Sequence, residues 1–426
     1  MFFRWFVSPT VRQACAVRKH VQRLLAAQRD ILSPQAIGGV TLPLSQLRDA
    51  IATGETIGKI RLKMDELDFA ANKWLKPYPN AMWRENVEVL LVAVAVAMAI
   101  RTFFLQPFKI PTGSMQPTLF GVTSKNYLPH DGQPGDPAFK IPTGWERIKQ
   151  WFAGTSYLHV VAQADGTIDS ISPMTHFLIF NIRQSFTING VEHVMWFPPD
   201  YGEAQPGMDP MVYRAGLHPH TEFERGQSYH KGDDVVKLRV SAGDHLFVDR
   251  FTYNFRKPQR GEIIVFQTAG IPQARREVFG IPGDQFYIKR LVGLSGETLS
   301  LAQDYDVTGV PQFGSQSVPV GHLVVNGQPL SASTPHFENL YSFPGVPPGT
   351  KTIRYQENQY YGHALIRELE PGREFQMDTN HLFVMGDNTM NSLDSRFWGD
   401  FPDSSVIGKS FFVYWPLTPR FGWGNQ

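Results

Sequence analysis

A run of twelve apolar residues, Val89–Ile100, is the feature that most restricts how this chain can fold. A helix that crosses a bilayer needs about 20 mostly apolar residues. The stretch Trp83–Leu105 is long enough if Arg101 extends its guanidinium to the interface, and it has aromatic residues at both ends. We therefore expect a transmembrane anchor over residues 83–106. The alternative is a helix buried in a protein core, which a run of this length also fits.

The charges on the two sides of this run differ. Residues 1–88 contain 13 Lys and Arg against 8 Asp and Glu, whereas the remainder contains 27 against 31. The positive-inside rule then favours a cytoplasmic N-terminus and an extracytoplasmic C-terminal part. The whole chain has a net charge of only +1, so no general basic field is available to bind nucleic acid. A single cysteine, Cys15, excludes intrachain disulfides and multi-cysteine zinc sites.

Residues 1–82 are expected to form an N-terminal helical cytoplasmic region. Val11–Leu32 and Leu44–Trp74 are rich in residues that favour helices, and the second piece is interrupted near Gly54. No chemistry is evident here, and we interpret the region as helices exposed to solvent or lying on the membrane surface.

The sequence after Pro107 is typical of β structure. Short runs of Val, Ile, Phe and Tyr are bounded by Gly, Pro, Asp or Asn. Asn326-Gly327 predicts a two-residue type I′ hairpin, and Trp145–Phe152 is the best short helix. The predicted strands are His245–Phe251, Glu262–Gln267, Gln285–Leu294, Thr298–Ala302, His322–Val325, His381–Met385 and Lys409–Trp415.

Ser114 is the first candidate for chemistry. It lies about ten residues beyond the expected membrane exit, directly after Gly113 and between two prolines. Glycine allows backbone to pass close to a ligand, and the prolines restrict the flanks. On its own this pattern is weak, because most serines near Gly and Pro are turn residues.

Lys289 is the second candidate, and it is followed by Arg290 inside an apolar strand. Alternation along a strand sends these two side chains to opposite faces. One can then reach a carboxylate while the other enters an apolar site, where desolvation disfavours the ammonium form. A neutral lysine amine can take the proton of a serine hydroxyl. The alternative is a solvated lysine on an edge strand.

A polar segment from Gly386 to Gly399 is the third candidate, and it concentrates Asp, Asn, Ser and Arg after an apolar strand. Such a loop must satisfy its own backbone and can orient other groups. The alternative is an ordered turn with a surface pair between Asp394 and Arg396.

These segments, taken in order, resemble bacterial type I signal peptidase, the membrane-anchored Ser-Lys protease of the S26 type. The matching stretches cover roughly a quarter of the chain, and their shared order carries the resemblance. They are Gln106-Pro107-Phe108-Lys109-Ile110-Pro111-Thr112-Gly113-Ser114-Met115, Gly243–Val248, Pro258–Phe266, Tyr287–Gly293 and Gly386–Gly399.

The resemblance implies residue roles. Ser114 would be the nucleophile and Lys289 the general base, while Ser392 would orient the lysine amine. The Ser114 backbone N–H and the Thr112 hydroxyl would form the oxyanion hole. Thr112 stands where the family more often has Ser, which keeps the hydroxyl but restricts its rotamer. Two supporting ion pairs are implied as well: Arg290 with Asp387, and Asp394 with Arg396.

The resemblance also implies the fold and the setting. We expect a mainly β catalytic region with an N-terminal helical region and one transmembrane helix. The catalytic core would combine residues 107–122, 242–302 and 378–420, with 303–377 as a second β-rich subdomain. Residues 123–241 would be an insertion of unknown role. The expected activity is removal of signal peptides from exported preproteins after small residues, at the bacterial inner membrane and without a cofactor.

Three alternatives accompany this reading. His218-Pro219-His220-Thr221-Glu222 could suggest a metal site, but no second ligand cluster supports it, and no metal is expected. Self-cleaving Ser-Lys domains of SOS-type repressors share the dyad but have no membrane span. A catalytically inactive membrane scaffold would be favoured if the nucleophile, the base or the orienting serine were missing, and all three are present.

Overall fold

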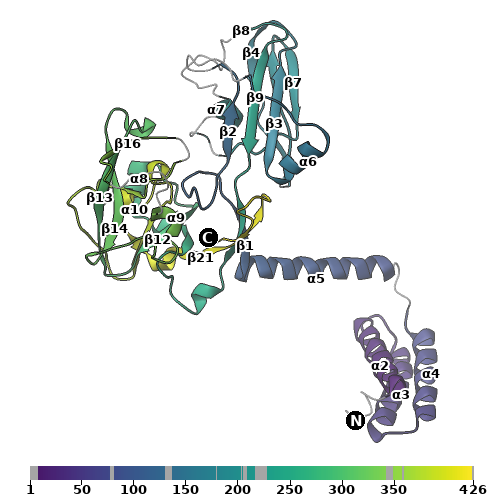
Figure 1. The fold of residues 1–426 in the computed structure, drawn as a ribbon. Helices are drawn as coiled ribbons and strands as arrows, with labels where there is room; N and C mark the ends of the chain where they lie inside the picture. Colours follow the sequence, from purple (N-terminus) through teal and green to yellow (C-terminus); the bar gives the residue numbers. More distant parts are fainter. Residues whose placement is uncertain are drawn as a thin grey trace. The chain divides into compact units, whose positions relative to one another are not determined.

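The structure, a computed structural model, describes residues 8–76, 81–129, 137–178, 180–202, 204, 209–215, 228–341, 349–356 and 359–424. The chain divides into two compact units, Met1–Val96 and Ala97–Gln426. The first is helical, and the second is mostly β and contains the candidate site (Figure 1).

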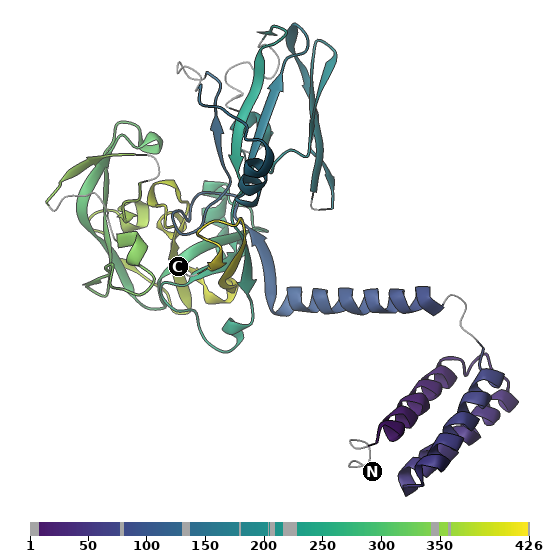
Figure 2. The same cartoon turned by 45° about the vertical axis from the view of Figure 1, so that its right-hand side comes forward.

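The N-terminal unit contains three helices that lie side by side: α2 (Pro9–Ala27), α3 (Pro34–Thr53) and α4 (Ile57–Trp74) (Figure 2). They share a buried core that includes Ala14, Val40, Leu47 and Leu67. The predicted N-terminal helical region is confirmed, and the packing of its apolar faces into a shared core was not predicted.

The predicted start of the second helical piece, at Leu44, is wrong. This piece divides into α3 and α4 near Gly54, as predicted, where Gly54 adopts a positive φ of 75°. However, α3 begins at Pro34, ten residues before the predicted start. Ser33 caps it by accepting a hydrogen bond from the Ala36 N–H at 3.2 Å. Proline is well suited to the first position of a helix, so Ser33-Pro34 was a start signal.

Helix α5 (Ala81–Phe103) contains the long apolar run. Its segment Glu85–Phe103 has a mean hydropathy of 1.8 and is long and apolar enough to cross a membrane. The apolar side chains from Val89 to Ile100 are exposed in the structure. They do not pack into a protein core, which argues against the buried-helix alternative.

The main sheet of the second unit is antiparallel and supports the candidate site. Its order is β1 (Leu105–Lys109), β10 (His245–Asp249), β21 (Val406–Trp415), β11 (Ile263–Gln267), β12 (Phe286–Gly293), β19 (His381–Met385) and β20 (Phe401–Pro402), and β22 (Gly422–Trp423) pairs with β21. The predicted strands in this region are confirmed with small shifts at their ends. Buried apolar clusters pack on it, one of which includes Ile110, Met115 and Leu119 from the segment around Ser114.

A second sheet follows β12 in the sequence. It contains β13 (Thr298–Thr308), β14 (Val318–Val325), β15 (Gln328–Pro329), β16 (Thr352–Arg354), β17 (His363–Ala364) and β18 (Phe375–Gln376). Asn326 and Gly327 connect β14 to β15 with φ values of 49° and 78°. Both values are positive, as a type I′ turn requires, so the predicted hairpin is confirmed.

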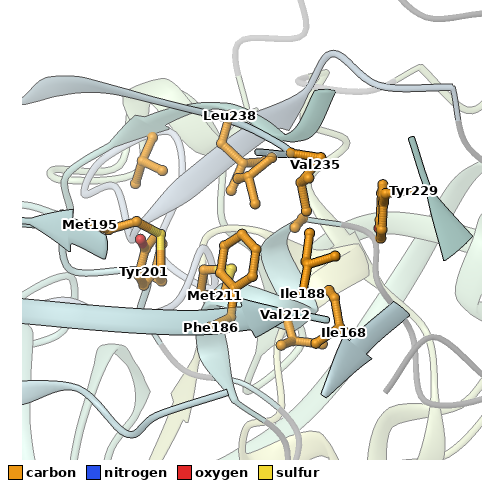
Figure 3. Close-up of a cluster of buried hydrophobic side chains, with 14 of the residues drawn as sticks. Ile168, Phe186, Ile188, Met195, Tyr201, Met211, Val212, Tyr229, Val235 and Leu238 are labelled. Carbon is orange, nitrogen blue, oxygen red and sulfur yellow. The ribbon is translucent and has the colours of Figure 1, made fainter. Parts of the chain in front are cut away.

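Residues between the Ser114 segment and β10 form further β structure. One sheet has the order β2 (Thr123–Asn126), β9 (Asp234–Ser241), β3 (Thr155–Val161); the other contains β4 (Gly166–Ile171), β5 (Thr175–Phe177), β6 (Phe180–Ile188), β7 (Val191–Trp196) and β8 (Ser228–Tyr229). Figure 3 shows their shared core, which includes Phe186, Ile188 and Leu238. A core of its own indicates that this segment folds as a body rather than as a long loop.

The short helices are α6 (Gly144–Phe152), α7 (Pro210–Arg214), α8 (Gln273–Phe279), α9 (Glu338–Tyr341) and α10 (Ser395–Trp398). The 3₁₀ turns are η2 (Thr252–Asn254), η3 (Thr268–Gly270), η4 (Pro311–Phe313), η5 (Arg367–Leu369), η6 (Thr389–Asn391) and η7 (Asp403–Ser405). Helix α6 confirms the predicted helix Trp145–Phe152, whereas α8 was not predicted.

Candidate active site

Ser114 lies in a loop that follows β1 and is held by its apolar neighbours. Met115 and Leu119 are buried in the core beneath the main sheet. Gly121 packs against the other end of the loop, and a Cβ at this position would lie 2.1 Å from the Thr112 carbonyl oxygen. Any side chain at Gly121 would therefore displace the segment that leads into Ser114.

Lys289 reaches Ser114 from β12. Its Nζ donates a hydrogen bond of 2.7 Å to the Ser114 Oγ, and a second of 3.1 Å to the carbonyl of Ile288. Lys289 and Ser114 are 5% and 7% exposed. Strand β12 pairs with β11 over residues 286–290 and with β19 from Arg290 onward. Because Lys289 is buried, the alternative of a solvated lysine is wrong.

Arg290 points to the opposite face of β12 and pairs with Asp387. Its Nε and Nη2 donate bonds of 2.7 and 2.6 Å to the two carboxylate oxygens. The pair is buried, and Thr118 adds a 2.5 Å hydrogen bond from its hydroxyl to Asp387. Three segments that are distant in sequence are thereby joined: the Ser114 loop, β12 and the loop after β19.

Asp394 and Arg396 form a second buried pair. Arg396 donates from Nε and Nη2 to the two carboxylate oxygens at 2.8 and 2.7 Å. Both side chains are fully buried, so the surface-pair alternative is wrong. Burial alone would raise the pKa of Asp394, but the charge of Arg396, with hydrogen bonds from Arg396 and the Gly386 N–H, holds that pKa below its usual value.

Asn388 binds the loop that carries the candidate nucleophile. Its backbone N–H donates to the Ser114 carbonyl at 3.0 Å, and its side-chain amide donates to the Gly113 carbonyl at 3.1 Å. Two consecutive peptide units of the nucleophile segment are thus fixed by one residue. Asn388 was not among the residues predicted to act in the site. Its position directly after Asp387 was the only available signal.

Ser392 lies within the same cluster. A Cβ on Gly386 would lie 2.1 Å from the Ser392 Oγ and 2.5 Å from the Ser114 carbonyl, so only glycine permits this packing. The Ser392 hydroxyl is buried and lies close enough to Asp394 to hydrogen-bond to its carboxylate. Its role in orienting Lys289 stays a prediction.

Thr112 is exposed at the rim of the site. Among the described residues, none accepts a hydrogen bond from its hydroxyl or from the Ser114 backbone N–H. A polar pocket of about 450 Å³ adjoins this rim. Its lining includes Thr112, Gly113, Asn388 and Asn391 from the site, together with tyrosine and glutamine side chains from elsewhere in the unit.

Two unpaired strand edges lead to the dyad. Strand β1 pairs with β10 on one side only, and residues 286–289 of β12 pair with β11 but with no other strand in the described ranges. The two strands lie close together at these edges. The rings of Phe108 in β1 and Phe286 in β12 are 5.4 Å apart in an edge-to-face arrangement. An extended peptide can therefore add to these edges close to Ser114.

Two groups of residues have side chains that could bind a metal ion. His218-Pro219-His220-Thr221-Glu222 lies outside the described residues. Elsewhere, ligand atoms of Asp378, His381 and Asp400 lie within 4.8 Å of one another, but this group is partly exposed. It combines the first residue of β19 with residues that precede β19 and β20. No residue of the candidate site belongs to it.

The family described as "Signal peptidase, peptidase S26" matches residues 83–129 and 236–415, slightly more than half of the chain. This chain belongs to the signal peptidase S26 family. Both dyad residues lie inside the matched ranges, whereas residues 130–235 and the N-terminal helices lie outside them.

Individual relatives agree with this assignment. The chain is 30% identical over 213 residues to signal peptidase I of Pseudomonas aeruginosa, covering 42% of this chain and 62% of that protein. It is 29% identical over 180 residues to signal peptidase I of Leptolyngbya laminosa, covering 42% and 64%. The chain thus spans a little over three fifths of these curated relatives. A solved signal peptidase I from Enterococcus faecalis is 24% identical, with a TM-score of 0.21, and covers 36% of this chain and 97% of that one.

Proposed function

We propose that this protein is a membrane-anchored serine endopeptidase that removes signal peptides from exported preproteins by a Ser-Lys dyad. The observation that carries the proposal is the 2.7 Å hydrogen bond between the Lys289 Nζ and the Ser114 Oγ, in a chain of the signal peptidase S26 family. Both groups are nearly inaccessible to solvent, which favours an uncharged amine next to the hydroxyl.

The first chemical step is acylation. Uncharged Lys289 accepts the proton of Ser114, and the Ser114 Oγ forms a bond to the carbonyl carbon of the scissile peptide. The carbonyl electrons move to the oxygen, where the Ser114 N–H and the Thr112 hydroxyl stabilise the developing charge. Lys289 then transfers its extra proton to the leaving nitrogen. The C–N bond breaks and releases the mature chain.

Deacylation repeats these roles with water. Lys289 removes a proton from a water molecule, the hydroxide attacks the ester carbonyl, and the Ser114 oxygen leaves and regains its proton from Lys289. Ser392 is assigned the role of orienting the amine through both steps. Its buried hydroxyl beside Gly386 places it in the same cluster. No cofactor or metal takes part in this scheme.

The substrate is an extended peptide with small residues before the cut. The unpaired edges of β1 and β12 can hydrogen-bond to the backbone of such a peptide on its way to Ser114. The preference for small side chains one and three residues before the cut is carried over from the family. The polar pocket beside Thr112 has no lining residue from β1 or β12. We therefore assign it to the part of the substrate that follows the scissile bond.

Helix α5 would anchor the enzyme in the bacterial inner membrane, with the N-terminus in the cytoplasm and the catalytic unit outside it. The greater positive charge before the helix supports this orientation. Anchoring beside the bilayer raises the effective concentration of preproteins that are held by their own signal peptides.

Cleavage of a signal-bearing preprotein by the detergent-solubilised full-length protein tests this proposal. Ser114→Ala and Lys289→Ala are both expected to abolish cleavage after a small-residue site while the fold is retained. Lys59→Ala, in the exposed pair with Glu55, serves as a matched lysine control. Unaffected cleavage by Lys289→Ala would show that the base is assigned wrongly. No cleavage by folded wild-type protein would favour the alternative of an inactive scaffold.

A further inference from the structure

The segment between the Ser114 loop and β10 exposes an unusual set of aromatic side chains. At the turn between β5 and β6, Phe177, Leu178 and Phe180 are 60–84% exposed, and Trp196 and Phe197 at the end of β7 are 63% and 71% exposed. Isolated exposed apolar side chains are normal on protein surfaces, but a contiguous group of large ones marks a binding surface.

Helix α6 contributes to the same surface. Trp145, Ile148 and Trp151 recur at intervals of three residues, so they share one face of the helix, and each is at least 45% exposed. Arg147 and Lys149 lie between them in sequence, and Lys149 pairs with Glu146 at 3.6 Å, so these three side chains leave a net positive charge on the helix. A short helix with tryptophans on one side and basic residues on another is typical of a membrane interface.

These side chains lie at one end of the segment. Trp151, Phe180 and Phe197 line a single pocket of about 550 Å³, so α6, the β5–β6 turn and the end of β7 meet there. We call the surface formed by Trp145, Ile148, Trp151, Phe152, Phe177, Leu178, Phe180, Trp196 and Phe197 the aromatic end.

The opposite end of the segment lacks such exposure. Strand β6 runs from Phe180 at the aromatic end to Ile188, which pairs with Ile168 of β4, and β4 in turn pairs with β8. Among the described residues near that end, the most exposed large apolar side chain is Val191, at 38%. Large apolar side chains are therefore exposed at one end of the segment and not at the other. This difference indicates that the aromatic end contacts an apolar partner.

The aromatic end is also close to the end of α5 along the chain. Helix α5 ends at Phe103, and Lys109, at the end of β1, lines the same pocket as Trp151 and Phe180. Six residues of extended chain span at most about 20 Å. If α5 crosses a bilayer and leaves it near Phe103, the aromatic end is close enough to reach the bilayer surface.

We propose that the aromatic end lies in the interface of the lipid bilayer and forms a second membrane contact beside α5. Tryptophan and phenylalanine prefer the headgroup region, and the neighbouring Arg147 and Lys149 would attract anionic lipid. This contact rests on the membrane anchoring in the proposed function and goes beyond it, because it assigns a role to a segment outside the family match. Two contacts would restrain the catalytic unit relative to the membrane surface.

A site-specific fluorophore tests this contact in the full-length protein. The chain has one cysteine, so Cys15→Ser provides a background without thiols. Leu178→Cys and Trp145→Cys place a polarity-sensitive label on the aromatic end. Lys231→Cys is the matched control, because it is exposed and lies just before β9, whose eight residues run from there towards α6.

The labelled proteins are reconstituted into vesicles of phosphatidylethanolamine and phosphatidylglycerol. We expect labels at 178 and 145 to shift to shorter emission wavelength, to be quenched by spin-labelled lipid and to be protected severalfold from aqueous iodide, while the label at 231 does none of these. Equal iodide quenching at all three sites would overturn the proposal. So would protection that depends on protein rather than lipid concentration, because it would indicate contact with a second copy.

Two further measurements separate this proposal from the proposed function. Vesicle flotation of the triple variant Phe177→Ser, Leu178→Ser and Phe180→Ser reports anchoring by α5 without the aromatic end. Preprotein cleavage in detergent reports the dyad. The triple variant should cleave as wild type in detergent and several times more slowly when enzyme and preprotein share vesicles. Equal rates in vesicles would contradict a contribution of this contact to processing.

Discussion

The backbone N–H of Asn388 donates a 3.0 Å hydrogen bond to the carbonyl of Ser114, and the Asn388 side chain bonds the preceding carbonyl of Gly113 at 3.1 Å. The residue therefore sets the path of the chain immediately at the candidate nucleophile. Asp387, one residue earlier, is fixed by Arg290, and Arg290 is the neighbour of Lys289 on β12. A short buried network of hydrogen bonds therefore fixes the backbone at Ser114 and the strand that carries Lys289.

Asn388→Ala should lower kcat for preprotein cleavage about fivefold, with little change in KM. The variant removes the bond to Gly113 but keeps the backbone bond to Ser114, and one hydrogen bond is worth about 1 kcal/mol. Steady-state kinetics in detergent provide the measurement. Asn72→Ala, an exposed position on α4 in the N-terminal unit, is the matched asparagine control and should behave as wild type. An equal loss in both variants would contradict a positioning role for Asn388.

Thr112→Val should lower kcat by about 10²-fold, the usual cost of removing one oxyanion donor. The change replaces a hydroxyl by a methyl group of similar shape, and because Thr112 is exposed, the stability of the fold should not change. Thr112→Ser keeps the donor and should restore most of the activity. If the valine variant retains full kcat, the Thr112 hydroxyl does not contact the oxyanion.

Asp387→Asn should destabilise the fold by about 3–5 kcal/mol, because it leaves the buried guanidinium of Arg290 without a charged partner. Denaturant unfolding followed by tryptophan fluorescence measures this change. Glu146→Gln removes one partner of an exposed pair with Lys149 and should change stability by no more than about 0.5 kcal/mol. Replacing Arg290 and Asp387 together by apolar residues should recover part of the loss. Full stability of the single variant would contradict the assigned role.

The segments that carry chemistry could be predicted from the sequence because they are local. Ser114 is marked by Gly113 and two prolines, and Lys289 and Arg290 by their place in an apolar strand. The prediction that alternation sends these two basic side chains to opposite faces is confirmed by their different partners, Ser114 and Asp387. Residue roles in catalysis remain predictions.

What the sequence did not reveal depends on contacts between distant segments. The bonds from Asn388 to Gly113 and Ser114 join parts of the chain that no local pattern relates. The N-terminal core was missed because Gly38, Gly39 and Pro43 hide the helical period of α3. The aromatic end was missed for the same kind of reason, since Trp151 and Phe180 meet only after the sheets have formed.

Glu262 should make stability depend on acid. Burial alone would raise the pKa of its carboxyl, but Arg256, the Gln259 N–H, the Tyr253 hydroxyl and Lys409 lower it to about 2. The folded state is therefore favoured at pH values above the unfolded pKa, near 4.5, and this advantage is lost as the pH falls towards 2. Because solvent screens part of this interaction, the shift sets an upper bound of roughly 3 kcal/mol on the advantage at neutral pH.

Glu262→Gln should accordingly be less stable than wild type at pH 7, and the difference should shrink steadily between pH 4.5 and pH 2. Urea unfolding at a series of pH values measures the free energy of unfolding of both proteins, at pH 7 and through the acid range. Glu192→Gln, in an exposed pair with Arg183, is the control and should follow the wild-type curve. A difference between Glu262→Gln and wild type that stays constant down to pH 2 would mean that the substitution acts through packing rather than through the charge of the carboxylate.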